Sequence, residues 1–342
     1  MKAAVATKYG GPEVLEIQDL PRPIPGEGQI LARVRAIGLN FADLFARMGV
    51  YPHTPPAPFV PGLEFSGEVI ACGAGAARFT PGERVMGYSR HGSHAEFVVL
   101  SEAYAAAVPP GMGYPEAAAF LATGLTAYHG LIRLANLRPA ERLLVHAAAG
   151  GVGLASVQLA RALGAEVIGT AGSEEKVALA RKEGADHVIN YRRQDFEKEV
   201  QRITGGDGVD VIMDSIGGEV YRKSWRLLAP MGRYVLFGVS AVTGEGGINR
   251  LKAARVFGQM PPVFPPSLIS ANKALFGFNL GTLRGKEGYF REAMEELLAW
   301  YGRGGIRPLI GRTFPFGQIV EAHRYLQLRR SVGQVVVLFE EQ

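Results

Sequence analysis

Cysteine is almost absent from this chain of 342 residues, which contains only Cys72. One cysteine excludes an intrachain disulfide framework and a zinc cage built on several thiolates of the same chain. Clusters of basic charge are also missing. The net charge is +5, but the arginines at 192–193 and 329–330 form isolated pairs, and basic and aromatic residues do not alternate. We therefore expect no nucleic-acid partner.

Long apolar runs are missing as well. No stretch reaches the about 20 uninterrupted apolar residues that a membrane-spanning helix needs, because glycines and polar residues interrupt the most apolar region, 143–170. Residues 1–5 lead into a strand pattern without the apolar core of a signal peptide. A single cysteine fits a reducing compartment. The expectation is a cytoplasmic protein with no membrane span.

The length indicates two domains at about 150 residues each. Up to about residue 100, short strands separated by Pro/Gly turns predict a compact β-rich domain, with a short helix after Asn40 as N-cap. From about residue 115, strands alternate with helices, which is typical of a parallel sheet covered by helices on both faces. The expected strands are 142–147, 166–170, 187–191, 209–214, 233–238 and a candidate sixth at 274–280. Residues 240–273 are expected to be irregular apart from a helix at 248–257, and strands at 312–314 and 334–339 to rejoin the first domain.

The second domain is organised around residues 143–154. An apolar run typical of a buried parallel strand leads into Ala148-x-Gly150-x-x-Gly153, a G-x-G-x-x-G motif with alanine in the first place, and a helical pattern follows. Because Gly150 has no side chain, backbone N–H groups can approach a pyrophosphate, and Gly153 allows the helix to pack closely on the strand. The alternative is a tight strand–helix turn that binds nothing. The residues predicted to hold the phosphates of a dinucleotide are Ala149, Gly150, Gly151 and Val152.

The end of the next strand indicates which dinucleotide. In NAD sites an acidic residue about 20 positions after the glycines accepts a hydrogen bond from the ribose 2′-hydroxyl, but residues 169–173 read Gly-Thr-Ala-Gly-Ser. Ser173 can donate to a phosphate oxygen, Lys176 supplies a cation, and Tyr191 ends the third strand near the same corner. This pattern favours the 2′-phosphate of NADPH. Alternatively, Ser173 only caps the helix 174–182, Lys176 is solvated, Tyr191 packs, and the acids at 174–175 leave NAD open.

Five segments resemble the zinc-independent quinone oxidoreductases of the medium-chain dehydrogenase/reductase superfamily: 38–43, 61–67, 123–128, 146–153 and 205–210. The segment 240–273 and the residues 275–280 after it are similar to the synaptic-vesicle-membrane-protein-like branch. The resemblance implies an α/β protein with a GroES-like β-rich domain and a Rossmann doubly wound parallel sheet. Residues 1–122 would form the substrate domain, 123–282 the NADP(H)-binding domain, and 283–342 a return segment completing the first. It also implies a cofactor in the cleft between the domains and a homodimer.

The zinc alcohol dehydrogenases of the same superfamily provide a contrast. Asn40 and Leu63 stand where that group has its first cysteine ligand and a histidine, and neither residue type serves Zn²⁺ there. His91 and His94 come closest to a ligand pair, but a polar turn before a strand explains them. We therefore expect no metal site, and alcohol oxidation through a metal alkoxide is disfavoured.

Without a metal, the remaining chemistry is hydride transfer from NADPH to an electron-poor carbon. A quinone, enone or enal that accepts hydride places negative charge on its oxygen, which needs hydrogen-bond donors and a proton. The resemblance places Asn40, Thr126, Phe237, Gly238, Val239 and Phe278 near the nicotinamide. Thr126 has the alternative of bonding its own helix backbone.

Three residues of the first domain are candidates for catalysis. Asn40 can donate to a carbonyl oxygen or to the nicotinamide ribose, in addition to capping a helix. Tyr51 matches a family position at the substrate mouth, where its phenol would be a weak acid or an orienting donor; it also fits as cover for a proline-rich loop. Asp43 is expected to orient Asn40 rather than carry a proton, because the family often takes its proton from solvent.

Two features depart from the family pattern. Phe45 stands where some quinone reductases have tyrosine, which removes one donor. The segment 240–273 is longer than in compact members and rich in Pro, Met and Phe, so it is a substrate lid, a dimer surface or a membrane-contact patch, of which we favour the first two. The alternatives to a quinone or enone reductase are an enoyl thioester reductase and a weakly catalytic NADPH-binding protein that acts through membrane or protein contacts.

Overall fold

The computed structural model describes residues 1–244 and 247–339. Glu245 and Gly246 of the segment 240–273, and residues 340–342 of the expected return segment, lie outside the described residues. The chain forms two compact units. The first unit consists of Met1–Leu125, Gly281–Trp300 and Pro308–Gln342, and the second of Thr126–Leu280 and Tyr301–Arg307. The two-domain α/β fold expected from the sequence is confirmed.

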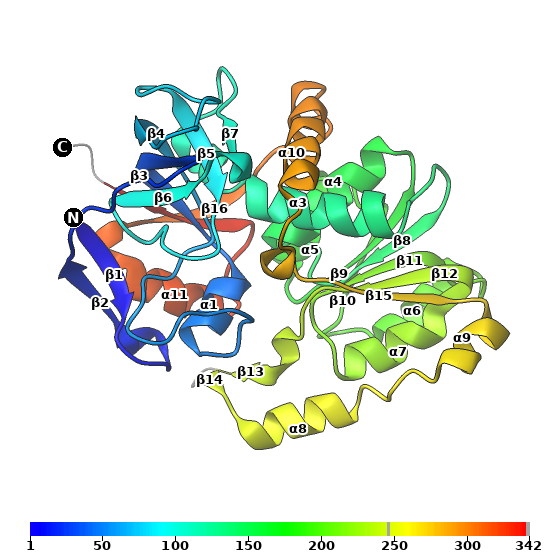
Figure 1. Cartoon of the computed structure of the whole chain (residues 1–342). Coiled ribbons are helices and arrows are strands. Elements are labelled where there is room, and N and C mark those ends of the chain that lie inside the picture. Colours follow the sequence, from blue (N-terminus) through cyan, green and yellow to red (C-terminus); the bar gives the residue numbers. More distant parts are fainter. Residues whose placement is uncertain (245–246, 340–342) are drawn as a thin grey trace. The chain divides into compact units, whose positions relative to one another are not determined.

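A seven-stranded sheet forms the centre of the first unit (Figure 1). Its strands follow the order β16-β17-β3-β4-β5-β7, and β6 pairs with the other half of β3. All pairings are antiparallel except that of β16 with β17. These strands are β3 (Gln29–Leu39), β4 (Glu64–Cys72), β5 (Arg84–Tyr88), β6 (Phe97–Ser101), β7 (Ala105–Ala107), β16 (Ile310–Pro315) and β17 (Gln334–Leu338), beside a separate pair of β1 (Lys2–Ala6) and β2 (Leu15–Asp19).

Short helices connect the strands of this unit. The helices wholly inside it are η1 (Pro12–Val14), α1 (Phe41–Arg47), η2 (Glu102–Tyr104), α2 (Tyr114–Ala118), η6 (Phe316–Gln318) and α11 (Ile319–Gln327). Three further helices contain residues of both units: α3 (Leu121–Tyr128), η5 (Leu280–Thr282) and α10 (Glu287–Gly302).

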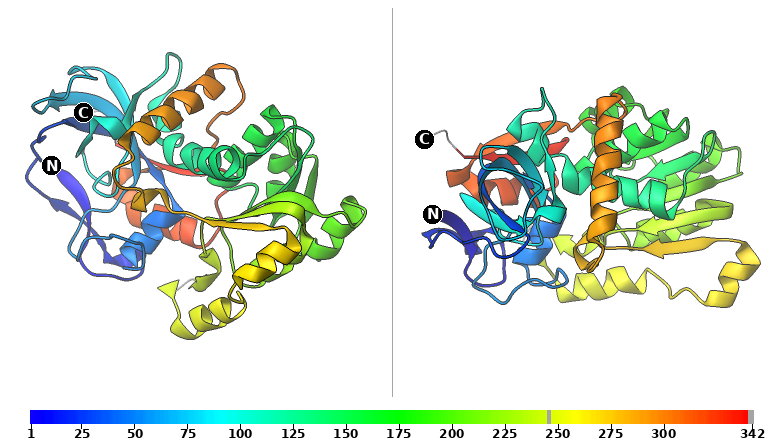
Figure 2. Two further views of the ribbon diagram at one scale, coloured as in Figure 1. Left: turned by 45° about the vertical axis from the view of Figure 1, so that its right-hand side comes forward. Right: turned by 45° about the horizontal axis from the view of Figure 1, so that its top comes forward.

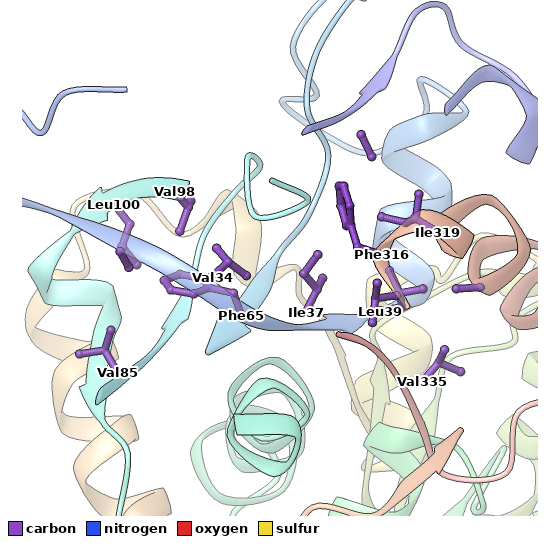
Figure 3. Packing of buried hydrophobic residues seen from close by; sticks show 14 of the residues in the cluster. Val34, Ile37, Leu39, Phe65, Val85, Val98, Leu100, Phe316, Ile319 and Val335 are labelled. Carbon is purple, nitrogen blue, oxygen red and sulfur yellow. The ribbon is translucent and has the colours of Figure 1, made fainter. Parts of the chain in front are cut away.

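The core of the first unit joins segments from both ends of the chain. Ile37 and Leu39 of β3 pack in one cluster with Phe65 of β4, Ile319 of α11 and Val335 of β17 (Figure 3). β3 is buried along most of its length, because it has strands on both edges and helices against it. This packing holds α1, which follows β3 directly, against α11.

A six-stranded parallel sheet forms the centre of the second unit, in the order β10-β9-β8-β11-β12-β15. The candidate sixth strand of the sequence is confirmed as β15, at the edge beside β12. The strands are β8 (Arg142–Val145), β9 (Glu166–Ala171), β10 (His187–Asn190), β11 (Val209–Asp214), β12 (Leu228–Leu236) and β15 (Ala274–Gly277). Strand order reverses between β8 and β11, which is the point where open α/β sheets bind ligands.

Helices cover both faces of this sheet (Figure 1). α4 (Gly151–Ala162) and α5 (Glu174–Lys182) lie on one face, and α6 (Phe196–Ile203) and α7 (Glu219–Leu227) on the other. Leu144, Ile168 and Ile212 of the sheet pack in one buried cluster with Phe196 and Leu227 of the helices. A π-helical turn, η3 (His129–Leu134), follows α3, and η4 (Ser240–Val242), β13 (Thr243–Gly244) and β14 (Gly247–Ile248) follow β12.

The segment 240–273 is more helical than the sequence predicts. The expected helix is present as α8 (Arg250–Gly258), but a second helix, α9 (Pro265–Ala271), lies in the stretch expected to be irregular (Figure 2). The prediction was wrong because prolines in the first turn of a helix lose no hydrogen bond, and α9 begins on two of them. Phe257, Phe264 and Ile269 are 57%, 68% and 78% exposed, so the segment presents apolar side chains to solvent.

Candidate active site

The glycine turn of the second unit lies between β8 and α4. Gly150 is the N-cap of α4 and has extended backbone angles. A Cβ on Gly153 would lie 2.2 Å from the carbonyl oxygen of Ala147, so only glycine allows this close packing. A Cβ on Gly150 would meet nothing nearer than that same oxygen, at 3.4 Å. The fold itself therefore tolerates a side chain at Gly150, and its absence leaves space beside the first N–H groups of α4.

The carboxyl ends of β9 and β10 are neighbours in the sheet, and we call the residues that follow them the β9/β10 corner. Ser173 is the N-cap of α5, and its Oγ accepts a hydrogen bond from the backbone N–H of Lys176 at 3.3 Å. A Cβ on Gly172 would lie 2.5 Å from the hydroxyl oxygen of Tyr191, which brings Tyr191 to this corner. The carboxylate of Glu174 accepts from the Asn190 amide at 2.6 Å and pairs with Arg193 at 3.1 Å. The carboxylate of Glu174, which follows Ser173 directly, is therefore already engaged in a hydrogen bond and an ion pair.

The residues expected at the nicotinamide end follow two neighbouring strands. Phe237, Gly238 and Val239 come after β12, and Phe278 comes after β15. The rings of Phe237 and Phe278 stack with centroids 6.0 Å apart. Thr126, also expected at this end, is half-buried in α3, and Asn40, the sixth expected residue, belongs to the first unit.

Sequence reasoning missed Asp214 at the end of β11. This buried carboxylate accepts from the backbone N–H groups of Ile216 at 2.6 Å and Gly217 at 3.2 Å, and from the Tyr234 hydroxyl at 2.8 Å. It fixes the loop at the carboxyl end of the strand. The available signal was an acid at the end of an apolar strand, followed by the glycines at 217–218.

In the first unit, Asn40 occupies the N-cap position of α1, as expected. Its backbone N–H donates to Asp43 Oδ2 at 2.7 Å. Its side-chain Nδ2 donates to Glu64 Oε1 at 2.7 Å, and its Oδ1 accepts from Gln334 Nε2 at 3.3 Å. The amide group of Asn40 is therefore held in a fixed orientation by residues of β4 and β17.

Glu64 is a buried carboxyl group that the sequence analysis did not select. Its oxygens accept from Asn40 Nδ2 at 2.7 Å, from Gln334 Nε2 at 3.2 Å and from the Ala122 backbone N–H at 2.8 Å. Burial raises the pKa of Glu64 to about 7, and these three donors act against that rise. The hydrogen bond that Glu64 accepts from Asn40 thus helps to fix the position of the Asn40 amide group.

Asp43 is also completely buried. Burial raises the pKa of this carboxyl group to about 8; the N–H of Asn40 acts in the opposite direction, and the nearby Glu64 adds to the rise. Behind Asp43 lie His94, at 4.0 Å from Asp43 Oδ1, and the imidazole of His323. Arg47 Nη1 donates to His323 Nδ1 at 3.2 Å, although Arg47 itself is fully buried. The sequence gives no local signal for this group, because its members come from α1, a turn and α11.

A pocket of the first unit brings Asp43 and Tyr51 together. Its wall also contains Phe59, Arg90, His91 and several prolines of the loop 52–61. Tyr88, at the end of β5, is buried, which raises its pKa well above the usual value; its hydrogen bond with Tyr51 adds to the effect. The pocket thus places a phenol and a carboxyl group beside prolines, an arginine and a histidine.

In residues 1–244 and 247–339, no group of three or more His, Cys, Asp or Glu side chains is placed to hold a metal ion. Within the same residues, no helix has the length and apolar character needed to cross a membrane.

Comparison with known proteins places this geometry in a family. Residues 26–110 match the alcohol dehydrogenase GroES-like domain, and residues 151–300 match the zinc-binding dehydrogenase family. The chain is 38% identical to the synaptic vesicle membrane protein VAT-1 homolog of Homo sapiens, over 99% of this chain and 86% of that protein. It is 36% identical to quinone oxidoreductase of Pseudomonas aeruginosa, over 96% of this chain and 97% of that protein.

A solved structure agrees with these relatives. The Escherichia coli quinone oxidoreductase complexed with NADPH matches with a TM-score of 0.87 and 32% identity, covering 99% of this chain and 100% of that one. Both halves of the chain, their order and their folds thus match the same group of proteins. The chain belongs to the medium-chain dehydrogenase/reductase superfamily, with VAT-1 homologues and quinone oxidoreductases as its relatives.

Proposed function

We propose that the chain is an NADPH-dependent oxidoreductase that transfers hydride to a quinone or an α,β-unsaturated carbonyl compound. The observation that carries this proposal is the glycine turn at α4, where Gly150 leaves space that the fold does not need. The likeness to a quinone oxidoreductase complexed with NADPH supports the same conclusion.

The residues present fit this dinucleotide. Ala149, Gly150, Gly151 and Val152 offer backbone N–H groups at the N-terminus of a 12-residue helix, whose dipole favours a pyrophosphate. Ser173, Lys176 and Tyr191 surround the corner where β9 and β10 end, and Glu174 is bonded to Asn190 and Arg193. An anionic 2′-phosphate suits this corner better than a free 2′-hydroxyl, so we assign NADPH rather than NADH.

When bound, NADPH supplies a hydride to an electron-poor carbon. The residues of this chain then have to stabilise the negative charge that develops on the substrate oxygen. Tyr51 lines the pocket and would donate to that oxygen. We assign Asn40, Thr126, Phe237, Gly238, Val239 and Phe278 to the nicotinamide end; the amide of Asn40 is held in place by Glu64 and Gln334.

Steady-state oxidation of NADPH tests the proposal. The purified protein is offered a panel of quinones, enals and enones, with NADH in parallel, and the loss of reduced-nicotinamide absorbance is followed. Turnover that prefers NADPH supports the assignment and ranks the acceptor shapes. Tight NADPH binding without turnover of any acceptor contradicts it.

The exposed apolar side chains of Phe257, Phe264 and Ile269 favour a second candidate, a weakly catalytic NADPH-binding protein that contacts a membrane or another protein. It predicts liposome association that is lost when residues 257–268 are deleted. We also propose that the protein is a cytoplasmic homodimer, which sedimentation and cell fractionation would test.

A further inference from the structure

Three buried titratable side chains lie behind the pocket of the first unit. Asp43 comes from α1, His94 from the turn before β6, and His323 from α11, and each is 0% exposed. Asp43 Oδ1 lies 4.0 Å from His94 Nε2, and the rings of His94 and His323 contact edge to face at 5.2 Å. Four polar atoms of this group have no hydrogen-bond partner in the described chain: Asp43 Oδ1, both ring nitrogens of His94, and His323 Nε2.

Unpaired polar atoms at this depth cost stability and therefore need an explanation. Gly62 packs closely on this turn: a Cβ on the glycine would lie 2.3 Å from Ser93 Oγ, 2.5 Å from His94 Cδ2 and 2.6 Å from the His94 backbone nitrogen. Its positive φ also favours glycine. The imidazole of His94 is therefore closely packed although it makes no hydrogen bond.

The environment keeps His94 uncharged. Burial lowers the pKa of His94 to about 3. Because an arginine only donates, the bond from Arg47 Nη1 to His323 Nδ1 places the proton of a neutral His323 on its Nε2. Burial, the nearby His94 and the positive charge of Arg47 lower the pKa of His323 well below its usual value, so His323 is uncharged as well.

An uncharged His94 gives Asp43 no counter-ion, so Asp43 retains its proton. The contrast with Glu64 is informative, because the two carboxyl groups share one buried region. Glu64 accepts three N–H hydrogen bonds, as a carboxylate does, whereas Asp43 accepts the Asn40 N–H on Oδ2 and has no partner on Oδ1. The titratable groups facing Asp43 are Glu64 of β4, Arg47 of its own helix, His94 and Tyr88. Of the two carboxyl groups, Asp43 therefore keeps its proton to the higher pH.

We propose that Asp43 is the proton donor to the reduced substrate and that His94 is a positioning residue that keeps Asp43 protonated between turnovers. The proposal rests on the function proposed above, and it replaces the orienting role expected for Asp43 from the sequence. Asp43 lines the same pocket as Tyr51. As the hydride reaches the acceptor carbon, an electron pair moves to the substrate oxygen, the O–H bond of Asp43 breaks, and a new O–H bond forms on the product. The carboxylate of Asp43 then takes a proton from water that enters after product release.

Infrared spectroscopy of the resting protein tests the proton on Asp43 without any turnover. We expect a carbonyl band of a protonated carboxyl group that disappears as the pH rises through about 8. Asp43→Asn should remove this band, whereas the matched variant Glu64→Gln should remove only a band that disappears near pH 7. A band that disappears near pH 8 and is removed by Glu64→Gln but not by Asp43→Asn would overturn the proposal, as would the absence of any band that disappears near pH 8.

Turnover measurements test the proton transfer itself. In the wild type, kcat should fall above about pH 8. Asp43→Asn should lower kcat on the order of 10²-fold, the usual contribution of a general acid, and remove the alkaline fall. The same kcat and pH profile in the variant and the wild type would refute the role. The exposed His187→Gln serves as the control that leaves both unchanged.

Two variants at His94 separate positioning from simple packing. A glutamine at this position offers an N–H to Asp43 and should stabilise its carboxylate. In His94→Gln, the decrease of kcat at alkaline pH should therefore begin at a lower pH than in the wild type. His94→Leu offers no donor and should not move it downward. An identical profile in both variants would contradict the positioning role. A wild type that turns over no acceptor refutes the proposed function, while the infrared result still decides whether Asp43 holds the proton.

Discussion

The hydroxyl group of Tyr191 lies in the space that a side chain on Gly172 would fill, since a Cβ there would be 2.5 Å from its oxygen. This contact joins the end of β10 to the loop that follows β9. Tyr191 as a whole remains 47% exposed. Together with the start of α5, the contact defines the corner to which we assign the 2′-phosphate.

Lys176→Ala tests that assignment. Removing the cation should weaken NADPH binding by about tenfold more than NADH binding, which corresponds to about 1.4 kcal/mol for one partly exposed phosphate contact. Fluorescence titration with the two dinucleotides measures the difference. Lys182→Ala, in the last turn of the same helix, is the control. Equal weakening of both dinucleotides by Lys176→Ala would show that the corner does not select for phosphate.

Two glycine substitutions in one turn should have opposite effects. Gly150→Val should abolish binding of both dinucleotides while the melting temperature changes little, because the fold leaves space at this position. Gly153→Ala should instead destabilise the second unit, because its Cβ would lie 2.2 Å from the oxygen of Ala147. Thermal melts and binding titrations of both variants make the comparison. Unchanged binding in a folded Gly150→Val protein would mean that the turn is only structural.

Tyr51→Phe should lower kcat by about tenfold with little change in KM, since a donor to the developing oxyanion acts mainly in the transition state. Tyr88→Phe should have a smaller effect in the same direction, because its hydroxyl reaches the pocket only through Tyr51. Steady-state kinetics on one acceptor separate the two constants. A rise in KM alone after Tyr51→Phe would assign Tyr51 to substrate binding.

The buried groups predict a maximum of stability near pH 6.5. The ordinary pKa of an aspartate is 3.8, and the pKa of Asp43 in the folded protein is about 8. Between pH 3.8 and about 8, Asp43 is therefore protonated in the folded state and ionised in the unfolded state. The free energy of unfolding falls as the pH rises through this range. His94 and His323 have lowered pKa values, so the folded state binds fewer protons below pH 6.5, and stability is lost as the pH falls.

Urea denaturation across this range measures the balance. From pH 6.5 to 8 the wild type should lose about 2 kcal/mol, at about 1.4 kcal/mol per pH unit for one proton, with a further contribution from Glu64. Asp43→Asn should remove most of this alkaline loss and make the acid-side loss steeper, because the proton of Asp43 opposes the effect of the histidines between pH 3.8 and 6.5. An unchanged alkaline slope in the variant would show that Asp43 is ionised at neutral pH.

Sequence reasoning succeeded where a feature is local. The strand, glycine turn and helix around Gly150 lie within the consecutive residues 142–162, and the apolar periodicity of such a unit is visible without its neighbours. No helix is expected from the sequence where α9 lies, although two prolines occupy its first turn, where a helix tolerates them. The capping position of Asn40 was predicted correctly, but not the destination of its side chain, because Glu64 and Gln334 belong to other strands.

The group behind the pocket could not be predicted from local patterns. Asp43 and His323 are separated by 280 positions in the chain, and only the packing of α1 against α11 brings their surroundings together. His94 was considered as a possible metal ligand in the sequence and assigned to a polar turn. Its burial beside a second histidine, without a hydrogen bond, is a property of the folded unit alone.

The place of β17 has a consequence for synthesis of the protein. This strand, Gln334–Leu338, lies between β16 and β3, and its residues pair with residues 36–39. All residues of the second unit leave the ribosome before it does. Since domains fold as units during synthesis, the second unit can reach its final fold on the ribosome. The first unit keeps an unpaired strand edge on β3 until β17 has been synthesised and is free to pair.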